Sequence, residues 1–227
     1  MSFAHVYHLN ASLFQQLEAS YFACLHAADW VRVRSLKRQA DQQIRQLAYA
    51  TLYKLWRAHN PSATKPASVR HDSLGKPFIA QQAEHEPWHF NLSHSGQQIA
   101  IAFASSPVGI DIEYQRDVEV KTLAAHYFKN EPWVSHSLAT FYQAWVCKEA
   151  LLKAKGIGLR VDPTLITLHQ PSRRYAPVKS APSELELASY QYALIDSPKR
   201  YACAIACEGT TPTVQSHTLG LAQLLAL

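Results

Sequence analysis

The segment Pro107 to Glu113 (PVGIDIE) carries two carboxylates two residues apart. Its alternation of apolar and acidic residues predicts a β-strand, in which residues two apart share one face. Ile110 and Ile112 would enter the core, while Asp111 and Glu113 would project together with Cα atoms about 6.6 Å apart. Two carboxylates so close repel each other unless a cation lies between them, so the strand is a candidate metal site. An exposed acidic edge strand is the other interpretation.

A third carboxylate lies on a helix that the spacing of apolar residues predicts for Phe141 to Lys155 (FYQAWVCKEALLKAK). Glu149 and Lys153 are four residues apart and are therefore neighbours on one side of that helix, whereas Lys148 lies on another side with Trp145. Glu followed by Lys at this spacing is also common on solvated helices, where it contributes roughly a few tenths of a kcal/mol. The pair alone does not decide between chemistry and helix stabilisation.

The segment Phe90 to Gly96 (FNLSHSG) is rich in hydrogen-bonding side chains at a point where a strand is expected to give way to a turn. Polar side chains and free backbone N–H groups at such a turn are suited to bind a phosphate. Hairpin turns favour the same residue types for local hydrogen bonds, which is the alternative interpretation. The motif GKP at 75–77 is a weaker signal, since any exposed loop could contain it.

The elements that must hold these residues recur in the two halves of the chain. Each half contains a long amphipathic helix and, later, two short strands around a tight turn. The second hairpin matches the first position by position, and chance similarity of two hairpins is the alternative. The expected helices are 42–56 and 141–155, and the expected strands are 88–92, 98–103, 165–168, 190–195 and 200–205.

This repeat predicts the fold class α+β, with two similar lobes that each stack a helix on a small antiparallel sheet. The expected lobes are residues 1–105 and 106–227, and the acidic strand opens the second lobe. A cleft between the lobes is the expected place for an active site.

The composition indicates a folded protein with a moderate positive charge. Of the 227 residues 48% are hydrophobic, and 22 Lys and Arg against 17 Asp and Glu give a formal charge of +5. This surplus favours an anionic partner, but no run resembles a polybasic tail, so nucleic-acid binding is not expected. No apolar run reaches the ~18 residues of a membrane span and the first residues lack a signal-peptide pattern, so we expect a cytoplasmic protein without a membrane partner.

Four motifs, taken together and in this order, resemble those of the Sfp-type 4′-phosphopantetheinyl transferases. The resemblance implies a pseudo-dimer of two α+β lobes in one chain, expected as a monomer, with the active site in the cleft between the lobes. It implies a holo-[acyl-carrier-protein] synthase type enzyme, which moves the phosphopantetheine group of coenzyme A to a serine of an apo acyl carrier or peptidyl carrier protein and releases 3′,5′-ADP. The motifs are GKP at 75–77, FNLSHS at 90–95, GIDIE at 109–113 and WVCKEALLKAKGIGL at 145–159.

The resemblance also implies roles for individual residues. Asp111, Glu113 and Glu149 match three acidic positions around Mg²⁺, where oxygen ligands share the metal with a pyrophosphate. Glu149 and Lys153 are the candidate catalytic residues. Lys153 would offset charge on the phosphates, and Glu149 would take the serine proton, a role that a metal-bound water could fill instead. The expected coenzyme A ligands are Arg32, Lys76, Ser93, His94 and Lys153.

The motifs fix some of these ligands more firmly than others. Ser93 and His94 match the pair that binds the 3′-phosphate, with Lys76 beside it, while Arg34 fits the position of Arg32 nearly as well. A nonenzymatic homologue that binds a carrier protein or a nucleotide is the alternative function, and a basic nucleic-acid module lacks a recognition motif. The sequence leaves open whether the carrier serves fatty-acid, polyketide or nonribosomal peptide synthesis.

Overall fold

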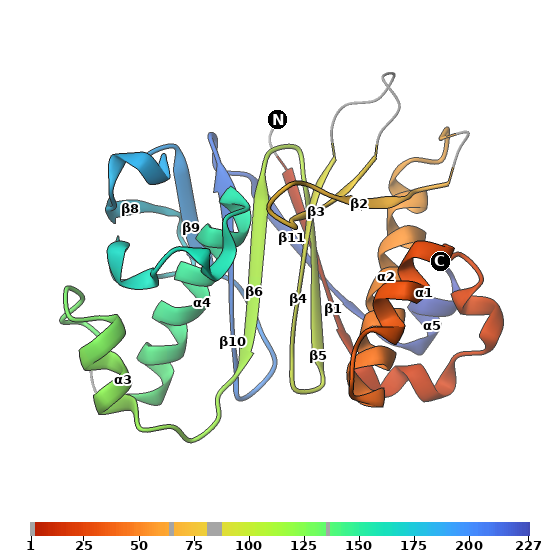
Figure 1. Cartoon of the computed structure of the whole chain (residues 1–227), viewed down its shortest axis with the longest axis horizontal. Helices are drawn as coiled ribbons and strands as arrows, with labels where there is room; N and C mark the ends of the chain where they lie inside the picture. Colours follow the sequence, from red (N-terminus) through yellow and green to blue (C-terminus); the bar gives the residue numbers. More distant parts are fainter. Residues whose placement is uncertain (1–2, 64–65, 81–87, 135–136) are drawn as a thin grey trace.

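The structure, a computed structural model, describes residues 3–63, 66–80, 88–134 and 137–227. Two sheets pack against each other at the centre, and one long helix covers the outer face of each sheet (Figure 1). The predicted α+β class is therefore confirmed. The strands are β1 (Phe3–Asn10), β2 (Val69–His71), β3 (Pro77–Ile79), β4 (His89–Ser95), β5 (Gln98–Ala104), β6 (Val108–Tyr114), β7 (Thr167–Leu168), β8 (Ala176–Ser180), β9 (Tyr190–Leu194), β10 (Tyr201–Glu208) and β11 (Thr213–Leu219). The α-helices are α1 (Ala27–Arg34), α2 (Gln39–His59), α3 (Val120–Tyr127), α4 (Leu138–Lys155) and α5 (Leu221–Leu225).

The first sheet has the strand order β11-β1-β5-β4 and is covered by α2. The apolar stripe of α2 is buried on the sheet at Ile44, Leu47, Leu52 and Leu55, which confirms the helix predicted from their spacing. One pairing differs from the all-antiparallel expectation, because β11 runs parallel to β1. Strands from the two ends of the chain need no tight turn between them, so nothing local forces them to be antiparallel.

The second sheet has the order β6-β10-β9-β8-β7, and α4 packs on β6, β10 and β9. Helix α4 ends at Gly156, which adopts a left-handed conformation with φ of 87°. Its N–H donates a hydrogen bond to the carbonyl oxygens of Leu152 and Lys153. Glycine is the usual residue for such a helix end because it lacks a Cβ. The break predicted at this glycine is thus confirmed.

Besides the cores under α2 and α4, a third group of buried apolar side chains lies between the two sheets. Small side chains of the first sheet, such as Ala100 and Ala102, face Ile110 and Ile112 of β6, and all four are buried. The two isoleucines therefore enter the core as their alternation predicted, which turns Asp111 and Glu113 to the α4 side of the strand.

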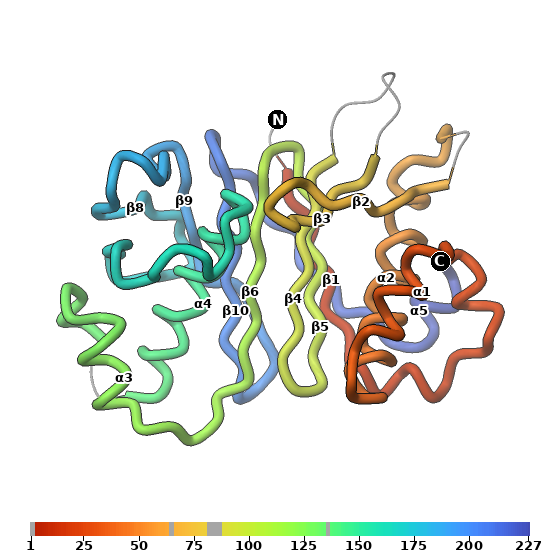
Figure 2. Tube along the Cα trace, viewed as in Figure 1, coloured from red at the N-terminus to blue at the C-terminus, as the bar shows by residue number. Residues whose placement is uncertain are grey.

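The C-terminal part of the chain returns to the first sheet. Strand β11 joins the first sheet, and Leu219 and Leu224 are buried in the core under α2, so the last part of the chain packs with the first (Figure 2). The division into lobes 1–105 and 106–227 stays a prediction. No helix within the described ranges is long and apolar enough to span a membrane.

At Gly109, β6 packs tightly against the backbone of α4. A Cβ at this position would lie 2.1 Å from the carbonyl oxygen of Ala150 and 2.3 Å from the backbone nitrogen of Ala154. Because both atoms belong to the backbone of a packed helix, neither can swing aside. We expect Gly109→Ala to destabilise the protein by about 3 kcal/mol through overpacking, measured by urea unfolding. The control is Gly220→Ala, whose Cβ would meet only a glutamine side chain, and equal stability of the two variants would contradict this contact.

Histidine rings gather where β1, β11 and the end of α2 meet. His5 Nδ1 lies 3.4 Å from His217 Nε2, and His59 Nε2 shares a 2.6 Å hydrogen bond with the Tyr7 hydroxyl. Desolvation, followed by the charges of His5 and His217, lowers the pKa of His59 from 6.5 to about 4. Burial thus keeps this ring neutral in the folded protein.

The same histidine makes stability depend on pH. Between pH 6.5 and 4 the unfolded chain binds a proton at His59 that the folded chain does not, so stability is full above this window and falls as the pH falls through it. After allowance for partial exposure, the loss amounts to about 2 kcal/mol. We expect His59→Gln to flatten the dependence of unfolding free energy on pH between 7 and 4. Parallel curves for the two proteins would contradict this assignment.

Candidate active site

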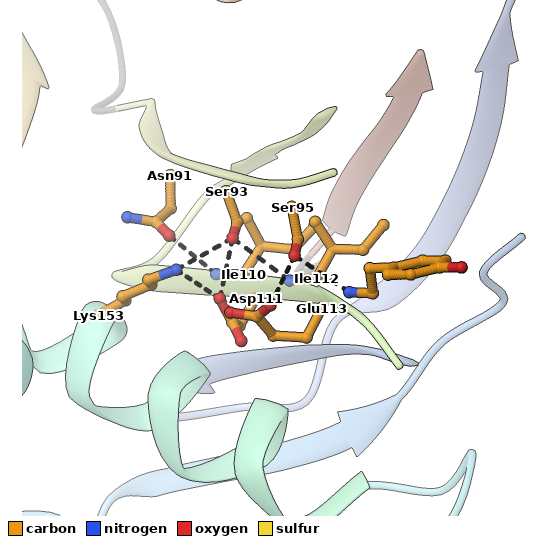
Figure 3. Close-up of polar contacts among 9 residues, drawn as sticks. Asn91, Ser93, Ser95, Ile110, Asp111, Ile112, Glu113 and Lys153 are labelled. Carbon is orange, nitrogen blue, oxygen red and sulfur yellow. Dashed lines mark hydrogen bonds and ion pairs between the residues drawn. The ribbon is translucent and has the colours of Figure 1, made fainter. Parts of the chain in front are cut away.

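The site begins at a seam between the two sheets, where β4 lies beside β6 (Figure 3). Strand β6 is an edge strand, and N–H groups on its free edge are bonded by side chains of β4. The N–H of Ile110 donates to the Asn91 side chain at 2.9 Å, and that of Ile112 donates to Ser93 Oγ at 3.3 Å. Alternate polar residues of β4 therefore replace a backbone ladder, which also protects the edge from other strands.

This seam corrects the expected position of the FNLSHS residues. The turn predicted from Ser95 begins only at Gly96, because β4 continues through Ser95. Asn, Ser and Gly favour turns when judged locally, but here the neighbouring strand satisfies the hydrogen bonds of the polar side chains. The polar residues are therefore on a strand, with successive side chains on opposite faces.

The strand carboxylates lie where the alternation predicted. Asp111 and Glu113 each accept a hydrogen bond from a serine of β4: Ser93 Oγ donates to Asp111 Oδ1 at 2.8 Å, and Ser95 Oγ donates to Glu113 Oε2 at 2.6 Å. Asp111 is 2% exposed, and its other oxygen, Oδ2, is buried without a hydrogen-bond partner. A buried carboxylate oxygen with no partner is unusual and is suited to bind a ligand.

Helix α4 brings two further charged groups to the same place. Lys153 Nζ donates to Asp111 Oδ1 at 2.5 Å and to Ser93 Oγ at 3.1 Å, so the lysine predicted beside Glu149 forms its ion pair across to β6. Glu149 is itself buried, with 9% exposed. The close approach at Gly109 lets the helix backbone come near enough for these contacts.

The carboxylates strongly influence one another. Desolvation and then the charge of Asp111 raise the pKa of Glu149 to about 7, and desolvation is also the main cause of the raised pKa of Glu113. Burial alone would lower the pKa of Lys153, but the surrounding carboxylates, above all Asp111, outweigh it and raise the pKa. Three acids and one lysine therefore form a site with excess negative charge.

These residues fit a hard divalent cation by their chemistry. Within the described residues no three side chains of His, Cys, Asp or Glu converge as a ready-made metal centre. The unpartnered oxygen of Asp111 and the mutual repulsion that it shares with Glu113 and Glu149 are nevertheless what a cation with oxygen ligands would relieve. A cation would also compete with Lys153 for Asp111.

Lys76 lies at the end of α4 and lines a cavity. Its Nζ donates to the carbonyl oxygen of Ala154 at 2.5 Å, and desolvation lowers its pKa to about 8. The cavity has a volume of about 400 Å³ and also reaches Lys153, so two predicted coenzyme A ligands face one space. Asn91 and the glycines after α4, Gly156 and Gly158, contribute to its wall.

His94 lies on the opposite face of β4 from the two serines and is exposed. Desolvation and then the charge of Arg45 lower the pKa of His94. Desolvation and then the charges of Arg32 and Arg45 lower the pKa of His71. The positive charge of Arg45 thus acts on both histidines, and that of Arg32 acts on His71. Ser93 instead donates its hydroxyl proton to Asp111. Because Ser93 and His94 lie on opposite faces of β4, His94 is the better candidate of the two for a phosphate ligand. That both bind one phosphate stays a prediction.

Two of these residues were not predicted as part of the site. Arg45 belongs to the densest basic stretch of the sequence, but nothing in its local pattern separates it from other surface arginines. His71 stands in β2, in no motif. Arg34, the alternative to Arg32, places its guanidinium 5.8 Å from the Trp30 ring. Arg32 is therefore the better candidate of the two.

Residues 107–206 match the model of the 4′-phosphopantetheinyl transferase superfamily. This segment contains β6, α4 and all three acids of the site, so the match covers the elements that carry the acids. The chain is 32% identical over 127 residues to 4′-phosphopantetheinyl transferase Sfp of Bacillus subtilis, covering 52% of this chain and 54% of that protein. A putative 4′-phosphopantetheinyl transferase of Haemophilus influenzae is also 32% identical over 127 residues, covering 52% of each chain.

A third relative is the 4′-phosphopantetheinyl transferase HetI of a Nostoc species, 36% identical over 107 residues, which cover 42% of this chain and 45% of HetI. The chain thus matches about half the length of these relatives or less. The resemblance to the Sfp-type family that the motifs indicated is confirmed.

Proposed function

We propose that this protein transfers the phosphopantetheine group of coenzyme A to a serine hydroxyl of an apo acyl carrier or peptidyl carrier protein and releases 3′,5′-ADP. The observation that carries the proposal is the ion pair of Lys153 with the buried Asp111 at the seam, where the charges of Glu113 and Glu149 also act on Lys153, within the segment that matches the superfamily. The names of the relatives support the same reaction. We further propose a monomer in the cytoplasm, with two similar lobes and the active site in the cleft between them.

The charged residues suit this reaction. Glu149, buried beside Asp111, would accept the proton of the carrier serine directly or through a metal-bound water. The serine oxygen forms a bond to the phosphorus next to pantetheine while the bond from that phosphorus to the 3′,5′-ADP oxygen breaks. Lys153, oriented by Asp111, would offset charge on the departing oxygen. Asp111, Glu113 and Glu149 would hold Mg²⁺, which supplies charge neutralisation of the pyrophosphate when bound.

The basic groups suit the nucleotide. Lys76 and Lys153 share the cavity at the end of α4, where they would face the phosphates of coenzyme A. His94, with Arg45 and Arg32 on its side of the molecule, is the proposed site of the 3′-phosphate. Hydrogen bonds to a charged phosphate are charge-assisted and are therefore stronger than those between neutral groups.

Replacing His94 with alanine tests this placement. We expect the variant to bind coenzyme A about 10-fold more weakly, because one charge-assisted hydrogen bond to the 3′-phosphate is lost. Binding of 3′-dephospho-coenzyme A should stay within about twofold of wild type, since that ligand lacks the phosphate. Isothermal titration calorimetry with both ligands measures the difference. An equal loss for the two ligands would show that His94 does not bind there.

The proposed reaction is tested by its nucleotide product. An apo carrier protein is incubated with this protein, coenzyme A and Mg²⁺, and 3′,5′-ADP is quantified by chromatography. We expect product in the same amount as carrier, and none with a carrier whose acceptor serine is replaced by alanine. Product without a carrier would indicate hydrolysis of coenzyme A instead of transfer. Absence of product with acyl and peptidyl carriers alike would count against the proposed function.

A further inference from the structure

Each serine of the seam uses one hydroxyl for two purposes. Ser95 Oγ accepts a hydrogen bond from the N–H of Tyr114 at 3.1 Å and donates its own proton to Glu113 Oε2 at 2.6 Å. A hydroxyl has a single proton to donate, so this arrangement fully commits it to one carboxylate oxygen. Ser95 is 5% exposed, so water has little access to replace either bond. The hydroxyl therefore fixes where the carboxylate of Glu113 points relative to the backbone of β6.

The pattern repeats along the two strands (Figure 3). Ser93 stands in the same relation to the N–H of Ile112 and the carboxylate of Asp111. Asn91 makes the corresponding bond to the N–H of Ile110, where the preceding residue of β6 is a glycine. Asn91 thus joins the two strands, whereas Ser93 and Ser95 both join the strands and hold a carboxylate. Because the side chains of a strand alternate, a shift of one residue in β4 would break all of these contacts together.

We propose that Ser95 is a positioning residue of the active site, which orients the carboxylate of Glu113 for cation binding from the opposite sheet. The inference rests on the metal role that the proposed function gives to Glu113. It goes beyond that function, because it assigns to a neutral side chain of β4 the control of a ligand on β6. Partners that orient a metal ligand typically change metal affinity about 10-fold to 100-fold when they are removed.

Binding of Mn²⁺ alone to the whole protein, followed by the electron paramagnetic resonance signal of the free ion, tests the proposal without any carrier or coenzyme A. We expect Ser95→Ala to raise the Kd for Mn²⁺ about 10-fold. Ser95→Thr, which keeps the hydroxyl, should restore most of the affinity. The control is Thr51→Val, which removes another buried hydroxyl, bonded to Tyr21 at 3.0 Å in the layer of α2, and should lower stability without changing the Kd.

The outcomes separate this proposal from the proposed function. A Kd for Ser95→Ala within twofold of wild type, or an equal rise in Thr51→Val, would overturn the positioning role. Absence of Mn²⁺ binding by the wild-type protein would overturn it as well. If Ser95→Ala does not fold, the Kd of Ser95→Cys decides, because a thiol of similar size is a weak hydrogen-bond donor and should lose affinity in the same way. Failure of wild type to modify any carrier would leave the Mn²⁺ result standing and would count only against the transfer reaction.

Discussion

Glu149→Gln is expected to lower kcat/KM for phosphopantetheine transfer by about 100-fold or more, because a positioned general base contributes about 10²-fold to 10⁴-fold. Glutamine has the same shape but cannot accept the proton of the carrier serine, and it also removes one anionic oxygen ligand. The thermal midpoint should not fall. Desolvation and the charge of Asp111 disfavour the ionised form of Glu149, so a neutral residue relieves a cost in the folded state.

The matched control for this prediction is Glu186→Gln. Glu186 forms an ion pair at 2.6 Å with Lys155, which lies on α4 as Glu149 does. The side chain of Glu186 is largely exposed and lies outside the seam. Its replacement should leave kcat/KM within about twofold of wild type, since exposed ion pairs contribute little. Steady-state rates of carrier modification measure both variants. Near wild-type transfer by Glu149→Gln would remove Glu149 from the catalytic site, whatever the control shows.

Lys148→Ala is expected to destabilise the protein by about 3–5 kcal/mol, the largest stability effect that we predict. Lys148 and Glu131 form a buried ion pair at 3.0 Å, with side chains 1% and 2% exposed. Glu131 also accepts a hydrogen bond from the N–H of Leu168, and Lys148 donates to the carbonyl oxygen of Tyr127. Removal of the lysine leaves a buried carboxylate uncompensated, which costs far more than the pair itself contributes.

Two further variants make this prediction specific. The double replacement Lys148→Met with Glu131→Leu should recover most of the lost stability, because apolar residues of similar volume substitute well for a buried pair. Lys155→Ala, which breaks the exposed pair with Glu186, should cost at most about 1 kcal/mol. Urea unfolding monitored by fluorescence gives all three values. A loss for Lys148→Ala no larger than for Lys155→Ala would contradict the importance of burial here.

The sequence predicts best what local periodicity determines. Helices α2 and α4 follow from apolar residues at helical spacing, and β6 follows from strict alternation, which also puts Asp111 and Glu113 on one face. Glu149 and Lys153 were correctly placed on one helix by spacing alone. The segment 165–168 was predicted as a strand but begins in a 3₁₀ turn over Pro163–Leu165, with only Thr167–Leu168 extended. Proline at the start of that turn favours the helical conformation.

The remaining features depend on contacts between distant parts of the chain. The strands β1 and β11 were not predicted, although their pairing joins the two ends of the chain. Ser95 looked like a turn residue because the strand that bonds it lies 18 residues away from it along the chain. The ion pair of Lys153 with Asp111 likewise spans 42 residues. No pattern within a window of one helix or strand carries this information, so the site residues could be proposed from the sequence while their partners could not.

The transfer reaction is tested most directly by the intact mass of an apo acyl or peptidyl carrier protein after incubation with this protein, coenzyme A and Mg²⁺. We expect the carrier to gain the mass of one phosphopantetheine group. EDTA should abolish the gain, and excess Mg²⁺ should restore it. A carrier with alanine at its acceptor serine should stay unmodified. No mass gain on carriers of several classes, under conditions in which this protein binds coenzyme A, would contradict the account and favour a nonenzymatic binding protein.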